Sequence, residues 1–271
     1  MKKEQLILWC GYALLFVIML VGILFVWNSR MTITQKLAQE EEAKRPADIE
    51  LTIISPVDCE KCLHGELLQE TIEKQEVHIL NAKTVSSDSD EAKNLIRIYN
   101  IQRLPAVIVK GEFDKANVQE TFLQLGGENV DDALLIQVSQ PVFVNVISGT
   151  PVGLVDVTYL MDSLCEDCYD PMAHQTILQK NFGIMIQNEQ TIDAQSDQGR
   201  ALIETYHVTE LPTVLLSAQA GVYRNLASTW TQVGTIEEDG TFVFRRNTAL
   251  GSVVYLNLET GEVVRPEPPK E

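Results

Sequence analysis

Five cysteines are the residues in this chain of 271 whose types and spacing most clearly suggest chemistry. Four of them form two Cys-x-x-Cys pairs, Cys59/Cys62 and Cys165/Cys168, and the fifth, Cys10, lies in an apolar N-terminal run. Two thiols at this spacing can exchange disulfides, because the second can attack a mixed disulfide that the first has formed. The sequence therefore predicts dithiol chemistry at two places.

Each pair is followed, at nearly the same distance, by a Leu-Pro dipeptide. These dipeptides are Leu104-Pro105 and Leu211-Pro212, and the apolar residues just before them align at the same offset. A constant offset over many positions indicates an internal repeat. The chain thus contains two copies of one unit, here called repeat 1 and repeat 2, with one dithiol in each.

Three interpretations of the pairs remain open on spacing alone. They are a reversible dithiol that exchanges disulfides, a stable disulfide in a binding domain, and metal ligation. A four-cysteine zinc site is disfavoured because each pair lies in its own repeat. We therefore expect disulfide exchange, with no metal and no cofactor.

Composition narrows the class of protein. A net charge of -17 would repel the phosphates of a nucleic acid, so nucleic-acid binding is not expected. With 45% hydrophobic residues, the chain is long enough for two domains with cores of their own.

The N-terminal residues predict a membrane anchor over residues 1–27. An uncharged run from Gln5 to Trp27 spans the roughly 30 Å hydrocarbon core of a bilayer as a helix. The run is too long for the usual core of a signal peptide, and no small-x-small cleavage site follows it, so we expect an uncleaved anchor. A buried core helix is the alternative. Cys10 is interpreted as an apolar filler in this segment.

Positive charge gives a mixed prediction of orientation. Lys2 and Lys3 favour a cytoplasmic N-terminus, whereas Arg30 and Lys36 follow the span. Because large domains cross a membrane largely regardless of their charge, we expect a single-pass protein with its domains outside the cytoplasm. Residues 28–48 are predicted to be a solvated stalk in which Pro46 ends any helix.

Hydrophobic periodicity predicts the elements that position the dithiols. In repeat 1, a buried strand ends at Ser55, the cysteines begin a helix, and Ser89 begins another helix before the proline. Residues 117–125 could be a helix or a strand, and Leu134 to Val144 are expected to form a strand with its connection to repeat 2.

Repeat 2 is expected to follow the same order, with additional hairpins at its end. Cys165 begins a helix that continues to about Lys180, and Ser196 begins the next helix. Hairpins are predicted around residues 238–240 and 259–261. A helix N-terminus at each first cysteine would stabilise its thiolate.

The order strand, Cys-x-x-Cys at a helix start, helix, strand, helix, Leu-Pro, strand resembles the thioredoxin fold. In arrangement the chain is similar to tandem-domain protein disulfide oxidoreductases. The resemblance implies an α/β protein with two tandem thioredoxin-like domains, each a central mixed sheet flanked by helices, after one transmembrane helix. The expected boundaries are residues 49–148 for domain 1, 149–264 for domain 2 with C-terminal hairpins, and 265–271 for a tail.

The resemblance also implies roles for the site residues. The nucleophilic thiols would be Cys59 and Cys165, and the resolving thiols Cys62 and Cys168. Pro105 and Pro212 would be cis prolines that face the dithiols. Together with Leu104 and Leu211, they would place backbone groups against an extended substrate chain.

Several residues depart from the thioredoxin pattern. Asp58 and Leu164 stand before the motifs where an aromatic residue is usual, and Ile53 and Tyr159 stand where a buried carboxylate is usual. Nearby carboxylates should oppose thiolate formation; they are Asp58, Glu60, Glu66, Glu166, Asp167 and Asp170. Because Lys61 offsets Glu60, repeat 1 is expected to hold the more reactive thiol.

Two of the four histidines lie just after the motifs. His64 and His174 could orient a thiol or ligate a metal ion, but exposed helix residues are the expected interpretation, whereas His78 and His207 are expected to pack in apolar surroundings.

The sequence as a whole predicts a membrane-anchored thiol-disulfide oxidoreductase. Its expected partners are cysteine-containing protein substrates, a redox partner protein or membrane oxidoreductase, and the membrane itself. The alternative is a non-catalytic thioredoxin-like adaptor whose disulfides are structural.

Overall fold

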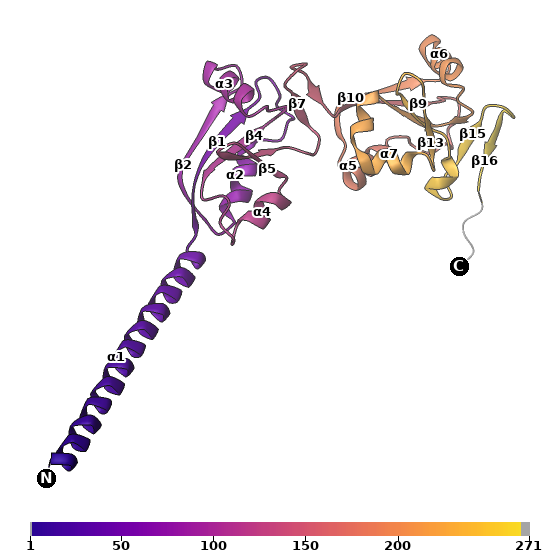
Figure 1. Cartoon of the computed structure of the whole chain (residues 1–271). Coiled ribbons are helices and arrows are strands. Elements are labelled where there is room, and N and C mark those ends of the chain that lie inside the picture. The colour runs from indigo at the N-terminus through magenta and orange to yellow at the C-terminus, as the bar shows by residue number, and fades with distance from the viewer. Residues whose placement is uncertain (1, 267–271) are drawn as a thin grey trace.

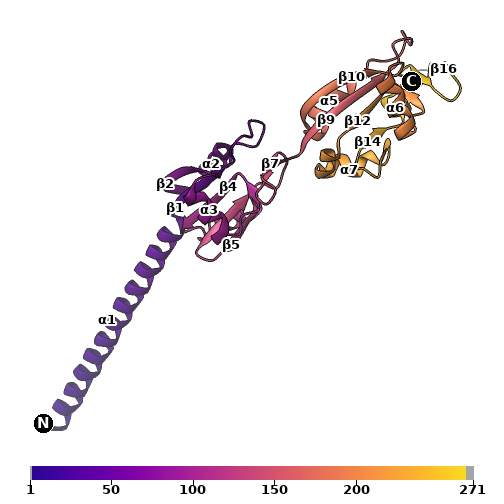
Figure 2. The same cartoon turned by 90° about the horizontal axis from the view of Figure 1, so that it is seen from above.

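The computed structural model describes residues 2–266, and for residues 2–18, 21, 23 and 29 it describes the backbone alone. A long helix, α1 (Lys2–Lys44), is followed by two mixed α/β units (Figure 1). Both views show α1 projecting from repeat 1, with repeat 2 on the far side of repeat 1 (Figures 1 and 2).

Helix α1 runs without interruption through the predicted stalk and ends just before Pro46, as the sequence predicts. Proline has no N–H to continue the helix, and it restricts the residue before it. The guanidinium of Arg45 then pairs with Glu42 and with Glu112, each at 2.7 Å. The end of α1 is therefore fixed to repeat 1.

The predicted anchor is described only in part. Of the helices among the described residues, none combines the length and the hydropathy that crossing a bilayer requires. Most of the predicted span falls on residues 1–18, whose side chains lie outside the described part of the chain. The anchor and the interpretation of Cys10 thus stay predictions, as does the tail, of which residues 267–271 also lie outside.

A five-stranded mixed sheet forms the centre of repeat 1, in the order β2-β1-β4-β6-β5. Strand β1 pairs parallel with β2 and antiparallel with β4, and β4 pairs antiparallel with β6. The five strands are β1 Ala47–Ser55, β2 Val77–Ser86, β4 Ala106–Gly111, β5 Gly127–Val130 and β6 Ala133–Gln137. The helices are α2 Gly65–Glu73, α3 Asp90–Ile98 and α4 Gln119–Gln124.

The start of α3 confirms the helix predicted from Ser89. The Ser89 hydroxyl accepts a hydrogen bond from the backbone N–H of Ala92 at 3.1 Å, which satisfies a donor that has no partner within the helix. In repeat 2 the hydroxyl of Ser196 accepts from the N–H of Gly199 at 3.0 Å. The second helix of each unit thus begins with the same cap.

The strand predicted with its connection to repeat 2 over Leu134 to Val144 is present as β6, and the connection holds a further strand that the sequence did not predict. Strand β6 ends at Gln137, and Pro141, which cannot donate to a ladder, precedes β7 (Phe143–Asn145). A second small sheet, β3-β7-β8, contains β3 Arg103–Leu104, β7 and β8 Pro151–Val152. The small sheet that follows the main sheet of repeat 1 therefore ends at Val152.

Repeat 2 has the same topology. Its main sheet has the order β10-β9-β12-β14-β13, and its small sheet has the order β11-β15-β16. The strands are β9 Leu154–Met161, β10 Met185–Asp193, β11 Glu210–Leu211, β12 Thr213–Leu216, β13 Gly234–Ile236, β14 Phe242–Phe244, β15 Tyr255–Asn257 and β16 Glu262–Val264. The helices are α5 Ala173–Phe182, α6 Asp197–Tyr206, α7 Arg224–Trp230 and the short 3-10 turns η1 Ala218–Val222 and η2 Asn247–Leu250. Both predicted hairpins are confirmed.

Each repeat has its own core, and a glycine joins the two. Among the residues whose side chains the structure describes, the buried apolar side chains form four clusters, two centred in repeat 1 and two in repeat 2. At the junction, Gly153 has a φ of +95°, and a Cβ there would lie 2.5 Å from the Cβ of Pro141. The Gly153 carbonyl accepts a hydrogen bond from the Tyr223 hydroxyl at 2.6 Å. Only glycine fits this junction without displacing Pro141.

Candidate active site

Both Cys-x-x-Cys pairs are closed as disulfides, Cys59–Cys62 and Cys165–Cys168. In each pair the N–H of the second cysteine donates to the carbonyl of the first at 3.2 Å, so the two motifs form the same turn. Cys62 is 4% exposed, whereas the other three cysteines are partly exposed. In repeat 1, therefore, the first sulfur is the one that a partner can reach.

The helix expected at each cysteine begins later than predicted. Helix α2 begins at Gly65, and α5 begins at Ala173 rather than at Cys165. In repeat 2 the carboxylate of Asp170 accepts from the N–H of Met172 at 2.9 Å, which forms a local turn beside Pro171 that delays the helix. The helix-terminus stabilisation predicted for the thiolates is therefore weaker, because this effect fades within the first turn.

The two prolines have the predicted isomer. The Leu104–Pro105 and Leu211–Pro212 peptide bonds are both cis. Both prolines are buried, and Leu104 and Leu211 are 3% and 0% exposed. The Cys168 sulfur lies 3.9 Å from the Leu211 carbonyl oxygen, which brings the second dithiol against the residue that precedes its proline.

The two repeats have the same order of elements around their dithiols. In each, a strand leads into the dithiol turn, a helix and a parallel strand follow, and a cis proline opens the strand that pairs antiparallel with the first. Each repeat has a thioredoxin-like fold. In repeat 2 the dithiol lies beside Pro212, and in repeat 1 it packs in one apolar cluster with Leu104, the residue before Pro105.

Comparison with known proteins adds distant similarities. No protein-family model matches the chain, and no curated protein matches it. One similar solved structure is an N-terminal fragment of the alkylhydroperoxide reductase AhpF from Enterococcus faecalis, with 15% identity, 69% of this chain and 89% of that chain covered, and a TM-score of 0.19. A protein disulfide oxidoreductase from Aeropyrum pernix has 15% identity, coverage of 70% and 82%, and a TM-score of 0.19.

A third similar structure is human ERp44 in a zinc-bound form, with 11% identity, coverage of 65% and 49%, and a TM-score of 0.17. TM-scores at this level do not establish a common fold. The thioredoxin-like assignment rests instead on the strand order, the dithiol turns and the cis prolines of the chain itself.

A buried polar network lies behind the dithiol of repeat 2. The Tyr169 hydroxyl is 3.0 Å from Nε2 of His174, 3.2 Å from the Pro212 carbonyl oxygen and 2.8 Å from Oδ1 of Asn247. Nδ2 of Asn247 donates to Glu210 at 3.2 Å. Burial raises the pKa of Tyr169, so its hydroxyl stays protonated and can donate. The network fixes the backbone at the second cis proline.

His174 belongs to this network, so the prediction of an exposed helix residue is wrong for it. The side chain is 4% exposed, and burial lowers its pKa from 6.5 to about 4. His64 is exposed, as predicted. The packing predicted for the other two histidines is wrong, since His78 is exposed beside Asp48 and His207 is exposed at the end of α6.

Ile53 and Tyr159 occupy the position at which the thioredoxin pattern has a buried carboxylate. Ile53 is 1% exposed, whereas the Tyr159 hydroxyl donates to Glu189 at 2.7 Å. Burial and this carboxylate raise the pKa of Tyr159. Glu189 reaches the Tyr159 hydroxyl from the neighbouring strand β10.

Charges around the dithiols are not arranged as the sequence suggested. The Lys61 amine donates to the carbonyl oxygens of Ile186 and Gln187 in repeat 2, at 2.8 and 3.2 Å. Between the other two cysteines, Asp167 pairs with Arg265. Lys61 therefore bridges the repeats, and Arg265 pairs with Asp167, one of the two acidic residues between Cys165 and Cys168. The charge difference between the two motifs is thus smaller than the sequence suggested, and the more reactive thiol of repeat 1 stays a prediction.

The second dithiol also lines a pocket of about 230 Å³, together with Pro212, Asp162 and Tyr169. The Asp162 carboxylate is 6% exposed and accepts hydrogen bonds from the Leu164 N–H and from Gln195, at 2.9 and 2.8 Å. Among the described residues, no group of three or more His, Cys, Asp and Glu side chains is placed to hold a metal ion.

The sequence interpretation missed that both repeats end in the same hairpin. Phe143-Val144-Asn145 and Tyr255-Leu256-Asn257 are each followed by a Ser or Thr and a Gly at the same spacing. Asn145 Oδ1 accepts from the backbone N–H groups of the second and third residues after it, and Asn257 Oδ1 does the same. This repeated Asn-x-x-Ser/Thr-Gly pattern was the available signal.

Proposed function

We propose that the chain is a membrane-anchored thiol-disulfide oxidoreductase that exchanges disulfides with cysteine-containing proteins outside the cytoplasm. The observation that carries the proposal is the occurrence, twice, of a closed Cys-x-x-Cys pair at the same place beside a cis proline. A structural disulfide needs no such neighbour, whereas an exchanging pair uses the adjacent backbone to hold its partner.

The exchange proceeds in two balanced steps. A substrate thiolate attacks the Cys59 sulfur, the disulfide to Cys62 breaks, and Cys62 leaves as a thiolate that takes up a proton. A second thiolate of the substrate then attacks the substrate sulfur that is bonded to Cys59, and Cys59 leaves as a thiolate that takes up a proton. The substrate gains a disulfide, and the pair gains two electrons and two protons. The reverse steps reduce a substrate disulfide.

Cys59 and Cys165 are proposed as the thiols that contact the substrate. The greater exposure of Cys59 than of Cys62 supports this assignment in repeat 1. In repeat 2 the pocket that contains Cys165 gives a partner access to the sulfur. A redox partner, either a soluble protein or a membrane oxidoreductase, would return each pair to its starting state.

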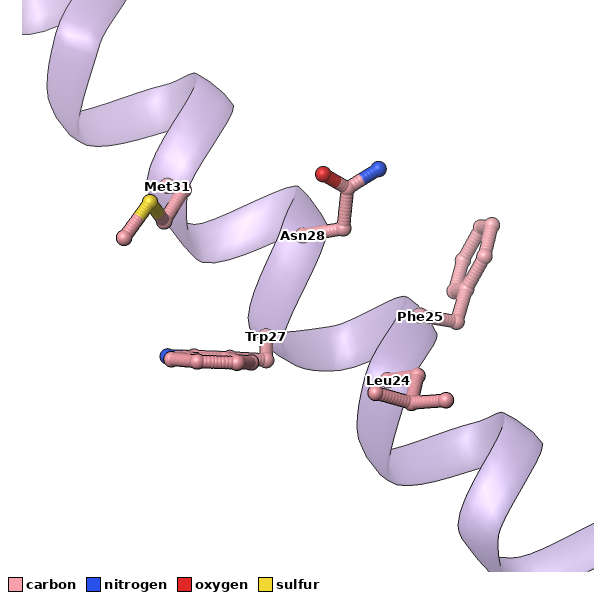
Figure 3. A pocket seen from close by; sticks show the side chains of 5 residues that line it. All are labelled: Leu24, Phe25, Trp27, Asn28 and Met31. Carbon is pink, nitrogen blue, oxygen red and sulfur yellow. The ribbon is translucent and has the colours of Figure 1, made fainter.

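Exposed apolar side chains on α1 support the membrane anchor. Leu24, Phe25, Trp27 and Met31 are 59%, 73%, 64% and 55% exposed, and they project from the helix in different directions (Figure 3). A helix that is apolar around its circumference requires a surrounding apolar medium. Together with the uncharged run from Gln5 to Trp27, this supports a membrane span at the N-terminal end of the chain.

A specific observation also favours the alternative, a non-catalytic thioredoxin-like adaptor. Both cis prolines are buried, and the backbone before each pairs with a strand of its own repeat. Redox titration of each pair separates the two functions, because an exchanger cycles at a potential that its compartment reaches and a structural disulfide resists reduction.

A further inference from the structure

The hairpin at the end of each repeat covers the backbone edge beside its dithiol. Strand β7 pairs with β3 so that Leu104 lies opposite Val144, and strand β15 pairs with β11 so that Leu211 lies opposite Leu256. These are the residues just before the cis prolines. The edge at which an extended chain could be added as a strand is therefore already paired in both repeats.

A second contact fixes each hairpin at the dithiol itself. The N–H of Leu63, directly after Cys62, donates to the Val142 carbonyl at 3.2 Å. The N–H of Tyr169, directly after Cys168, donates to the Val254 carbonyl at 2.9 Å. Each strand thus extends from the dithiol turn to the residue before the proline, which is the path that a substrate chain would follow.

Side chains complete the cover in repeat 1. Val142 and Val144 are 2% and 7% exposed and belong to the same apolar cluster as Cys62 and Leu104, against which Cys59 also packs. The guanidinium of Arg103 stacks over the Phe143 ring at 4.9 Å. The hairpin is therefore packed onto the site as well as paired with it.

The two hairpins are built alike although the repeats differ elsewhere. Gly149 donates to the Asn145 carbonyl at 2.8 Å, and Gly261 donates to the Asn257 carbonyl at 2.9 Å. The φ angles of the two glycines are +67° and +71°. A turn that recurs in this detail points to a shared role rather than to incidental packing.

We infer that each hairpin determines substrate specificity by occupying the strand-addition edge beside its dithiol. Each pair then exchanges with small or protruding disulfides that reach the first sulfur directly, and it excludes extended chains until its own hairpin unpairs. This inference rests on the proposed exchange function. The specificity-determining residues are Asn145 and Asn257, whose side chains hold the hairpin turns closed.

The test uses Asn145→Ala and Asn257→Ala in the full chain, each variant serving as the control for the other. The reduced protein is mixed with one of two oxidants, oxidised glutathione or an extended peptide that contains a single disulfide. Mass spectrometry then reports the oxidation of each cysteine pair. Losing the Asn145 side chain removes two hydrogen bonds, which raises the unpaired population roughly tenfold. Asn145→Ala should therefore speed peptide-driven oxidation of Cys59–Cys62 by about tenfold.

The same variant should leave oxidation by glutathione, and both rates at Cys165–Cys168, unchanged, and Asn257→Ala should show the reverse pattern. Amide hydrogen exchange at Leu63 and Tyr169 reports hairpin opening independently of activity. Faster amide exchange without faster peptide oxidation would overturn the inference. So would unchanged amide exchange in Asn145→Ala combined with Arg103→Ala, because the hairpin would then not be held by these contacts. If neither probe oxidised either pair in any variant, the exchange function itself would fail.

Discussion

Acidification should destabilise repeat 2 through the buried imidazole of His174. Burial lowers the pKa of this side chain from 6.5 to about 4. Because the pKa in the folded state is the lower one, the unfolded chain binds the proton more tightly. The stability that a neutral His174 contributes is fully present above the unfolded pKa and is lost as the pH falls towards 4.

The size of the effect follows from these two pKa values. Between pH 7 and pH 5 the free energy of unfolding of repeat 2 should fall by about 2 kcal/mol. For a domain of this size, that change lowers the melting temperature by about 8 °C. Repeat 1 lacks an equivalent network, since its His64 and His78 are exposed.

Fluorescence of Trp230 provides the assay. Its ring lies 6.4 Å from Phe244, and Phe244 lies 4.6 Å from His174, so this tryptophan reports unfolding of the relevant core. Trp9 and Trp27 would be replaced by Phe in every variant to remove their signal. Thermal unfolding is then followed between pH 7 and pH 5.

Two substitutions provide the controls. His174→Phe removes the titrating group and should abolish most of the pH dependence, whereas the exposed His64→Gln should leave it intact. An equal loss of stability between pH 7 and pH 5 in His174→Phe and in the parent protein would refute this reasoning, because a group other than His174 would then take up the proton.

Two further predictions concern the anchor and the contact between the repeats. Protease added to intact cells should degrade the chain beyond Asn28 and leave the N-terminal segment; protection of the repeats until the cells are lysed would place them in the cytoplasm instead. Lys61→Met should leave the alkylation rate of reduced Cys59 unchanged and should increase proteolysis near Gly153, because the Lys61 amine bonds to repeat 2. Slower alkylation of Cys59 in this variant would show instead that the charge of Lys61 acts on the neighbouring thiolate.

Local patterns predicted much of the fold. Ser89 and Ser196 predicted the starts of α3 and α6, since a hydroxyl before a helix satisfies a backbone donor within three residues. Pro46 predicted the end of α1. The two cis bonds came instead from the resemblance to the thioredoxin fold that the repeated Leu-Pro carries. In each case the residue that determines the structure acts on its immediate neighbours.

The errors arose where distant residues decide the structure. Besides the local Asp170 turn, a contact far along the chain keeps the residues after Cys168 out of α5, because the Tyr169 N–H donates to the Val254 carbonyl. His174 is buried because Tyr169 and Phe244 surround it, which its position after the motif does not reveal. Similarly, the sequence placed Lys61 beside Glu60, whereas the fold directs its amine to repeat 2.

Reduction potentials of the two pairs test the central claim most directly. The full chain would be equilibrated with glutathione or dithiothreitol buffers of known potential, alkylated, and analysed by mass spectrometry for Cys59–Cys62 and Cys165–Cys168 separately. Exchange activity predicts that both pairs titrate reversibly between about -270 and -120 mV, the range of known dithiol exchangers. Pairs that stay oxidised below about -300 mV would contradict the proposal and identify the disulfides as structural.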